Sequence, residues 1–189
     1  MAALEKQVRE TVRRYTYADY LEWDDDERWE LLDGIPYAMA APLISHQSVA
    51  GGIFLQIALF LRGKKCKVFF APTDVRLNPD FLDNTVVQPD VLVVCDEKKI
   101  EDNKAVRGAP DMVVEVLSPS TAYHDTMRKY RLYLKAGVRE YWIADPESKT
   151  VLVHILTDGE SSSRTYGETD KVPVTVLDGC VVELAEVFA

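Results

Sequence analysis

Three valine-rich stretches in the middle of the chain constrain its fold most strongly. They cover residues 66–77, 86–95 and 112–117, and Pro, Asn and Asp residues bound them. Valine favours β-strands, whereas Pro, Asn and Asp favour the turns that connect strands. We expect these stretches to form the centre of a β-sheet.

Two long helices are predicted, one before the first of these stretches and one after the third. The first, over residues 45–62, ends at Gly63, and its apolar residues recur at the three- and four-residue spacing of an amphipathic helix: Val49, Ile53, Ile57 and Phe60. The second begins at Ser120 or Thr121, either of which can cap it, and ends at Ala136 before Gly137. The sheet is therefore expected to carry helices.

A short helix and a hairpin are predicted near the start of the chain. Thr16 followed by Asp19 is typical of a helix start, and this helix is expected to run to Trp23. The dipeptide Asp33-Gly34 favours a tight turn between strands at residues 29–32 and 35–39.

After the second long helix the chain returns to strands, at residues 140–144 and 150–156, around a turn at Asp145-Pro146. Strands and helices thus alternate, which predicts the α/β class with a mixed central β-sheet and helices on both faces. A chain of 189 residues fits a single domain. We expect a core over roughly residues 16–157 and a C-terminal β extension over 158–189.

Charge and hydropathy limit the function. The chain has 22 basic and 31 acidic residues and a formal net charge of −9, which argues against a protein that coats nucleic acid. This argument has less weight for an enzyme that touches DNA only in a cleft, where the local field matters. Residues 1–14 lack the apolar stretch of a signal peptide, and no segment reaches the ~18 apolar residues of a membrane span. We expect a cytoplasmic protein without membrane contact.

The chain has three cysteines, Cys66, Cys95 and Cys180, which lie far apart and form no CxxC pair. An odd number at such spacing predicts neither a disulfide framework nor a zinc site. We expect all three to be small core residues.

Two acidic residues accompany the apolar strands. Asp90 precedes Val91, and Glu115 lies inside the third valine-rich stretch. A buried acid is costly unless it is paired or binds a metal. By itself Asp90 is as readily a cap or turn residue, and Glu115 could form a buried salt bridge, for example with Arg76. If their strands are neighbours, both carboxylates can approach one ion.

A wider set of motifs resembles the bacterial Uma-type family of restriction-endonuclease-like proteins, within the PD-(D/E)XK nuclease superfamily. These motifs cover most of residues 16–146, and the run from Glu115 to Trp142 is the most specific. They are the segment 29–34, His46, Gln88-Pro89-Asp90, Val114 to Thr121, Asp125 to Lys129, Tyr133 and Gly137 to Trp142.

This resemblance implies a restriction-endonuclease-like fold and a catalytic lysine. The sequence departs from the superfamily pattern two residues after Glu115, where Leu117 stands in place of lysine. The resemblance implies that the lysine has moved to the following helix, as Lys129, whose long side chain can reach back to the strand. Without the resemblance, Lys129 would be read as a surface partner of Asp125. Lys135 is the alternative lysine on the same helix.

The resemblance further implies a third carboxylate, Glu30, and a role for His46. Glu30 could equally be an outward strand residue, and His46 a structural residue at a helix start. With Asp90 and Glu115, Glu30 would bind Mg²⁺ or Mn²⁺.

The implied function is a metal-dependent DNA endonuclease, acting as a homodimer because two-fold symmetry suits the cutting of both strands. Basic residues that could contact phosphates occur in two groups, Arg62, Lys64, Lys65 and Lys67, and Arg128, Lys129, Arg131, Lys135 and Arg139. The acidic net charge and the missing strand lysine favour a non-cleaving module that binds nucleic acid or regulates. A structural or assembly protein is a third reading, suggested by Tyr17, Tyr20, Trp23 and Trp29.

Overall fold

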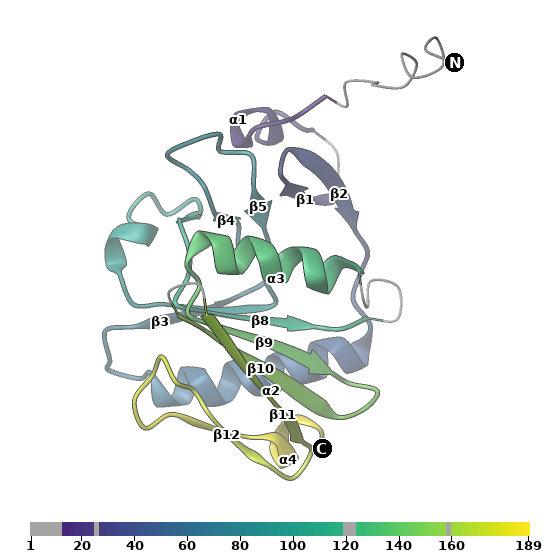
Figure 1. Cartoon of the computed structure of the whole chain (residues 1–189), viewed down its shortest axis with the longest axis vertical. Coiled ribbons are helices and arrows are strands. Elements are labelled where there is room, and N and C mark those ends of the chain that lie inside the picture. Colours follow the sequence, from purple (N-terminus) through teal and green to yellow (C-terminus); the bar gives the residue numbers. More distant parts are fainter. Residues whose placement is uncertain (1–12, 25–26, 119–123, 158–159) are drawn as a thin grey trace.

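A computed structural model describes residues 13–24, 27–118, 124–157 and 160–189 (Figure 1). Its main sheet is mixed, because β8 and β9 are parallel while the other neighbours are antiparallel. The spatial order is β11 (Glu160–Gly167), β10 (Thr150–Thr157), β9 (Glu140–Asp145), β8 (Met112–Val116), β6 (Val91–Val94) and β3 (Lys67–Phe70).

A helix covers each face of this sheet (Figure 1). Side chains alternate along a strand. On β6, Val91 and Val93 therefore pack in the core with α2 (Ile44–Phe60), whereas Leu92 and Val94 pack in the core with α3 (His124–Ala136). The predicted mixed sheet between helices is confirmed.

The C-terminal segment completes the core around α2. It contains β12 (Lys171–Pro173), β13 (Val181–Glu183) and α4 (Leu184–Val187). Gln56 of α2 exchanges two hydrogen bonds with the backbone of Glu183, at 2.8 and 3.1 Å. A Cβ at Gly52 would lie 3.2 Å from the Cα of Val187, so glycine allows the close approach of α4.

A second sheet, which carries one wall of the functional site, has the order β2 (Ile35–Met39), β1 (Arg28–Leu32), β5 (Val86–Val87), β4 (Val75–Arg76) and β7 (Val106–Arg107). The predicted hairpin at Asp33-Gly34 is confirmed, with φ of 53° and 79° at these residues. Helix α1 (Tyr17–Tyr20) begins at the predicted Thr16 cap, which forms a capping box with Asp19, but it ends before Trp23. A short 3₁₀ helix, η1 (Glu97–Ile100), precedes β7.

The valine-rich stretches differ in part from the prediction. The first two each break into two strands, and their halves lie in different sheets: β3 and β6 in the main sheet, β4 and β5 in the second. Strand β3 lies at an edge rather than at the centre. Helix α2 buries the predicted Ile53 and Ile57, but Ile44 and Leu55 of the same helix are 89% and 56% exposed, so it is apolar on more than one side.

The prediction for the cysteines was wrong for two of the three. Cys66 and Cys95 form a disulfide, and only Cys180 is a free buried cysteine. Lys67 pairs with Val94 in the antiparallel register of β3 and β6, which brings the residues just beyond them face to face. The pairing depends on this register, which cysteine spacing does not reveal.

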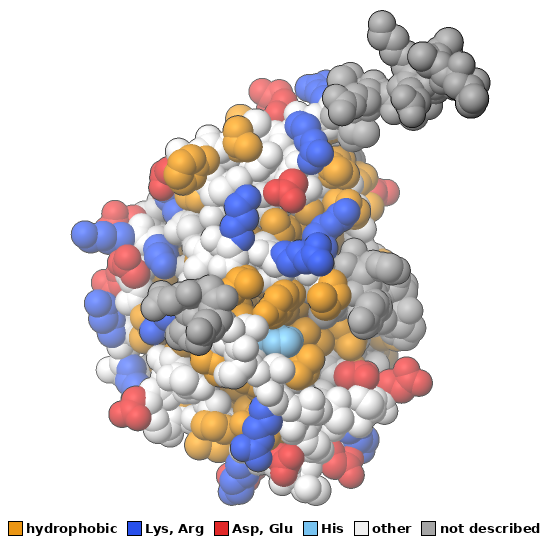
Figure 2. Space-filling model, in the orientation of Figure 1, with side chains coloured by type: hydrophobic (Ala, Val, Ile, Leu, Met, Phe, Trp, Pro, Cys, Tyr) orange, Lys and Arg blue, Asp and Glu red, His pale blue; other side chains and the backbone are white. Residues whose placement is uncertain are grey.

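Charges are spread over the surface in small groups. On the face shown in Figure 2, Lys and Arg side chains lie in several separate clusters with Asp and Glu between them. Within the described part of the chain, no helix is long and apolar enough to cross a bilayer.

Candidate metal and catalytic site

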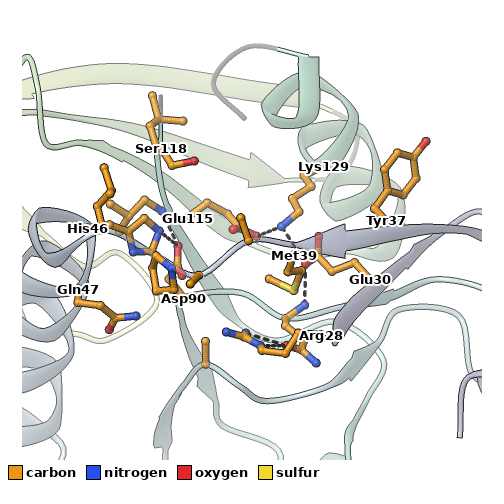
Figure 3. Close-up of a pocket in the computed structure, with 18 of the residues that line it drawn as sticks. Arg28, Glu30, Tyr37, Met39, His46, Gln47, Asp90, Glu115, Ser118 and Lys129 are labelled. Atoms are coloured by element: carbon orange, nitrogen blue, oxygen red, sulfur yellow. Dashed lines mark hydrogen bonds and ion pairs between the residues drawn. The ribbon is translucent and has the colours of Figure 1, made fainter. Parts of the chain in front are cut away.

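A cavity of about 400 Å³ lies where the β1–β2 hairpin, the start of α2, the end of β8 and α3 meet (Figure 3). All five residues predicted from the sequence to form the site line it. They are Glu30, His46, Asp90, Glu115 and Lys129. The structure thus brings together residues that are up to 99 positions apart in the chain.

Strand register places Asp90 beside Glu115. Val91 of β6 pairs with Val114 of β8 in the antiparallel register, so the residue before β6 faces the one after Val114. Oδ2 of Asp90 accepts a hydrogen bond of 2.7 Å from the backbone N–H of Val116, which fixes the carboxylate at the strand edge. Asp90 therefore lies directly before β6, as the alternative of a strand-initiating cap also predicts, and its carboxylate is bound to the backbone of β8.

Lys129 joins two acids from separate elements. Its Nζ lies 2.9 Å from Oε1 of Glu30 on β1 and 3.0 Å from Oε1 of Glu115 on β8. The Lys129 side chain is only 11% exposed. Burial alone lowers the pKa of this lysine, but the charges of Glu115 and Glu30 outweigh it and hold the pKa above its usual value. Lys129 is therefore a buried ammonium.

Glu115 is the most strongly perturbed acid of the site. Burial raises its pKa to about 7, the nearby charges of Asp90 and Glu30 act in the same direction, and Lys129 opposes them. The hydroxyl of Tyr133, one turn after Lys129 on α3, donates a hydrogen bond of 2.5 Å to Oε1 of Glu115. A carboxyl with a pKa near 7 takes up or releases protons close to physiological pH.

Glu30 is held from behind by the Gln-Pro-Asp motif. Its Oε1 accepts a hydrogen bond of 2.8 Å from the backbone N–H of Gln88. The Gln88 side chain accepts from Nε and Nη2 of Arg28, at 3.0 and 2.7 Å, and donates to Asp74 at 2.9 Å. Burial raises the pKa of Asp74. This network fixes the strand segment that leads to Asp90.

His46 lies in the first turn of α2 and is buried. Its Nε2 is 3.3 Å from Oδ2 of Asp90, and this hydrogen bond raises the pKa of the imidazole, against the effect of burial. Among the described residues, Nδ1 of His46 and the hydroxyl of Tyr141 are the buried side-chain polar atoms without a partner. Both residues line the cavity. Buried polar groups normally have partners, so these atoms are available to a bound group or to water.

The donor set fits a hard divalent cation. Mg²⁺ and Mn²⁺ prefer carboxylate oxygens, and Asp90, Glu115 and Glu30 offer these at one cavity. The described residues contain no group of three or more His, Cys, Asp or Glu side chains already arranged around a metal position. The Lys129 ammonium lies between Glu30 and Glu115 and contacts one oxygen of each.

The structure separates the alternatives for these residues. The alternative of a buried salt bridge at Glu115 is confirmed, but its partner is Lys129 rather than Arg76, which pairs with Asp83 at 2.6 Å. Lys135 is exposed and lines a different cavity. The Lys129 side chain points into the site rather than to the surface, whereas the side chain of Asp125 lies outside the described residues. Of the two predicted basic groups, only Lys129 lines the cavity.

Sequence reasoning missed Arg28 and Tyr133 as parts of the site. Arg28 lies two residues before Glu30 on β1, so the two share a strand face, and this period could have identified it. Tyr133 follows Lys129 by four residues on α3, which places both on one helix face.

Comparison with known proteins shows the family of this chain. A profile of the Uma2 family, described as "Putative restriction endonuclease", matches residues 17–185. The chain belongs to the Uma2 family. The family predicted from the sequence motifs is thereby confirmed.

Two known proteins are similar to this chain over most of its length. A Synechocystis sp. protein named "Uncharacterized protein slr1290" is 28% identical over 158 residues, which cover 82% of this chain and 81% of that protein. The crystal structure of "a putative nuclease belonging to DUF820" from Anabaena variabilis matches 92% of this chain and 97% of its own, with a TM-score of 0.74 and 18% identity. This structural likeness confirms the predicted restriction-endonuclease-like fold class.

Proposed function

We propose that this Uma2 family member is a metal-dependent DNA endonuclease in which Asp90 and Glu115, with Glu30, bind Mg²⁺ or Mn²⁺. One observation carries the proposal: two carboxylates face each other across β6 and β8 at the floor of a cavity, beside a buried lysine. Acids that bind a cation, together with a fixed positive charge, supply the charge stabilisation that promotes phosphodiester hydrolysis. Family membership supports the reaction class.

Each side chain has a role that follows from its contacts. A bound cation lowers the pKa of its water and neutralises charge on the phosphate. Lys129 reaches both Glu30 and Glu115, so its ammonium can orient the attacking water or stabilise the pentavalent phosphorane. His46 contacts Asp90 and limits the orientation of that carboxylate. Tyr133 donates a hydrogen bond to the same oxygen of Glu115 that Lys129 contacts.

The remaining parts of the proposal concern the setting. The proposed substrate is DNA. Two copies related by two-fold symmetry would present two such sites for cleavage of both strands. The proposed location is the cytoplasm, where bacterial DNA is found.

The proposal is tested by plasmid nicking with Mg²⁺ or Mn²⁺. The wild-type protein is expected to nick DNA, and Asp90→Asn and Lys129→Met are expected to abolish nicking. Lys135→Met is the control, because Lys135 lies on the same helix but outside the cavity. A purified protein that cuts no form of nucleic acid with either metal contradicts the proposal.

A second candidate is a non-cleaving module that binds nucleic acid or regulates. It is favoured by the pairing of both glutamates with Lys129, which satisfies them without a metal, and by the net charge of −9. Nucleic-acid binding without metal-dependent turnover, unchanged by Asp90→Asn, would support this candidate.

A further inference from the structure

One wall of the cavity is apolar and comes from a single segment. Residues 38–43, which we call the apolar arm, run from the end of β2 to the residue before α2 and have the sequence Ala-Met-Ala-Ala-Pro-Leu. All six line the cavity, and every one except Met39 is classed as exposed. No Asp, Glu, Lys or Arg occurs from residue 34 to residue 61. Phosphates find no charged partner along this wall, whereas the flat faces of nucleobases can pack against it.

Leu43 occupies an unusual position at the end of the arm. It is the N-cap of α2, where Ser, Thr, Asp or Asn normally satisfies a free backbone N–H. Its side chain makes no capping bond and is 54% exposed. The leucine therefore gives the helix less stability than serine would. Such a residue is expected where its apolar surface contacts a ligand.

Among the described residues that line the cavity, the Lys and Arg side chains are those of Lys129 and Arg28. Lys129 is engaged by two glutamates, and the Arg28 guanidinium donates twice to Gln88. A further hollow of about 540 Å³ beyond Leu43 is lined by Asp145 and Glu147 and by no Lys or Arg. A protein that grips a duplex neutralises about six to ten phosphates. On the face shown in Figure 2, the described Lys and Arg side chains lie in separate clusters.

The acids lie deep in the cavity. The side chains of Glu30, Glu115 and Asp90 are 7%, 14% and 16% exposed. A stiff duplex follows the walls of a recess of about 400 Å³ less closely, since bending a short stretch of duplex DNA costs free energy. An unpaired strand can follow them, because its bases splay out individually and its backbone turns at each nucleotide.

We propose that the preferred substrate of this site is a single-stranded nucleic acid, or the unpaired strand at an end or branch. A base packs on the apolar arm while its phosphate reaches Asp90 and Glu115. This inference rests on the proposed nuclease function and restricts its substrate class.

The first test compares strands in binding and in cleavage. Fluorescence anisotropy in EDTA measures the affinity of the full chain for a labelled 20-nucleotide DNA, its RNA counterpart and the blunt DNA duplex of the same sequence. We expect the single-stranded DNA to bind about tenfold more tightly than the duplex, as burial of about 60 Å² of apolar surface corresponds to this factor. Comparison of DNA with RNA decides between the two sources of an unpaired strand. With few phosphate contacts, the slope of log K against log salt should be no steeper than about −2.

The second test removes Leu43. Leu43→Ser is expected to weaken single-strand binding about fivefold while the melting temperature is unchanged or higher, because serine caps α2. Leu59→Ser is the matched control: Leu59 belongs to the same helix and is 50% exposed, but it does not line the cavity. This control should leave binding unchanged.

The outcomes separate this inference from the nuclease proposal. Equal or tighter duplex binding, or unchanged binding by Leu43→Ser, overturns the substrate class, and Asp90-dependent cleavage of the duplex then leaves the nuclease proposal intact. If Leu43→Ser instead splits a dimer without changing affinity, the arm is a contact between copies and the inference is wrong. Single-strand binding without cleavage of any strand under Mn²⁺ overturns both.

Discussion

Glu115 and Glu140 are glutamates on neighbouring parallel strands, yet the protein holds them in opposite ways. Glu140 on β9 is fully buried, and its carboxylate accepts hydrogen bonds from the indole of Trp142, at 2.8 Å, and from the backbone N–H of Val176, at 2.9 Å. Glu115 on β8 lines a cavity and is paired with Lys129. One acid is enclosed by neutral donors, and the other lies among charges that a ligand can reach.

This difference separates the structural acid Glu140 from Glu115, the acid that we propose binds a metal. Burial raises the pKa of both carboxyls, so burial and a perturbed pKa do not separate them. Glu140 ties β9 to the C-terminal segment through two fixed donors. Glu115 lies near Asp90 and Glu30 and pairs with the Lys129 ammonium. Further charges and access to a cavity are therefore the informative signs.

The largest expected difference between Glu115 and Glu140 is in the rate of DNA cleavage by their variants. Asp90→Asn and Glu115→Gln are each expected to lower the rate of metal-dependent DNA cleavage by about 10³-fold, because they remove oxygen ligands and charge stabilisation at the phosphate. Glu140→Gln should keep the rate within about twofold. The measurement is single-turnover cleavage of a labelled oligonucleotide. A similar loss in all three variants would mean that the comparison is wrong.

Stability should respond strongly to Lys129. Lys129→Met leaves Glu30 and Glu115 buried without a cation, and we expect a loss of about 3–5 kcal/mol of unfolding free energy at pH 8. Without the ammonium, the folded pKa of Glu115 lies further above its unfolded value, so the folded state binds more protons and regains stability as the pH falls. The variant should therefore be closer to wild type at pH 5 in urea titrations. Lys135→Met should stay within about 0.5 kcal/mol at both pH values.

Glu140 should affect stability alone. In Glu140→Gln, an amide group faces the two N–H donors of Trp142 and Val176, and it accepts hydrogen bonds less well than a carboxylate. We expect a loss of about 1–3 kcal/mol of unfolding free energy. Urea denaturation followed by tryptophan fluorescence measures this loss. An unchanged unfolding free energy would remove the structural role assigned to Glu140.

Metal binding should show a smaller, pH-dependent effect. With a pKa of about 7, Glu115 is largely protonated at pH 6, whereas an ordinary glutamic acid is ionised there. A cation favours the charged form, so Mn²⁺ binding at pH 6 should release about one proton, and affinity should rise between pH 6 and pH 8. Calorimetry in buffers of different ionisation enthalpy measures the released protons. No release at pH 6, or the same release in Glu115→Gln, would exclude Glu115 as the titrating ligand.

Local chemistry predicted a large part of this structure. The Asp33-Gly34 turn, the Thr16 cap and the buried face of α2 follow from interactions within a few residues. The high energetic cost of an acid in an apolar strand identified Asp90 and Glu115, which the β6–β8 register brings together.

Features that depend on distant contacts were not predictable in this way. The disulfide between Cys66 and Cys95 requires the register of β3 and β6, and the division of one valine-rich stretch between two sheets requires the whole topology. Lys129 was placed in the site by family resemblance, because its contact with Glu30 spans 99 residues. Glu140, which is fully buried, shows that a buried acid alone does not identify a site.

Titration of Mn²⁺ into the wild-type protein, Asp90→Ala and Glu140→Gln, with nicking assayed on the same samples, tests the central claim most directly. We predict that the wild type and Glu140→Gln bind Mn²⁺ and nick DNA, whereas Asp90→Ala does neither. Absence of Mn²⁺ binding by the wild type, or equal binding by Asp90→Ala, would contradict the proposed metal site.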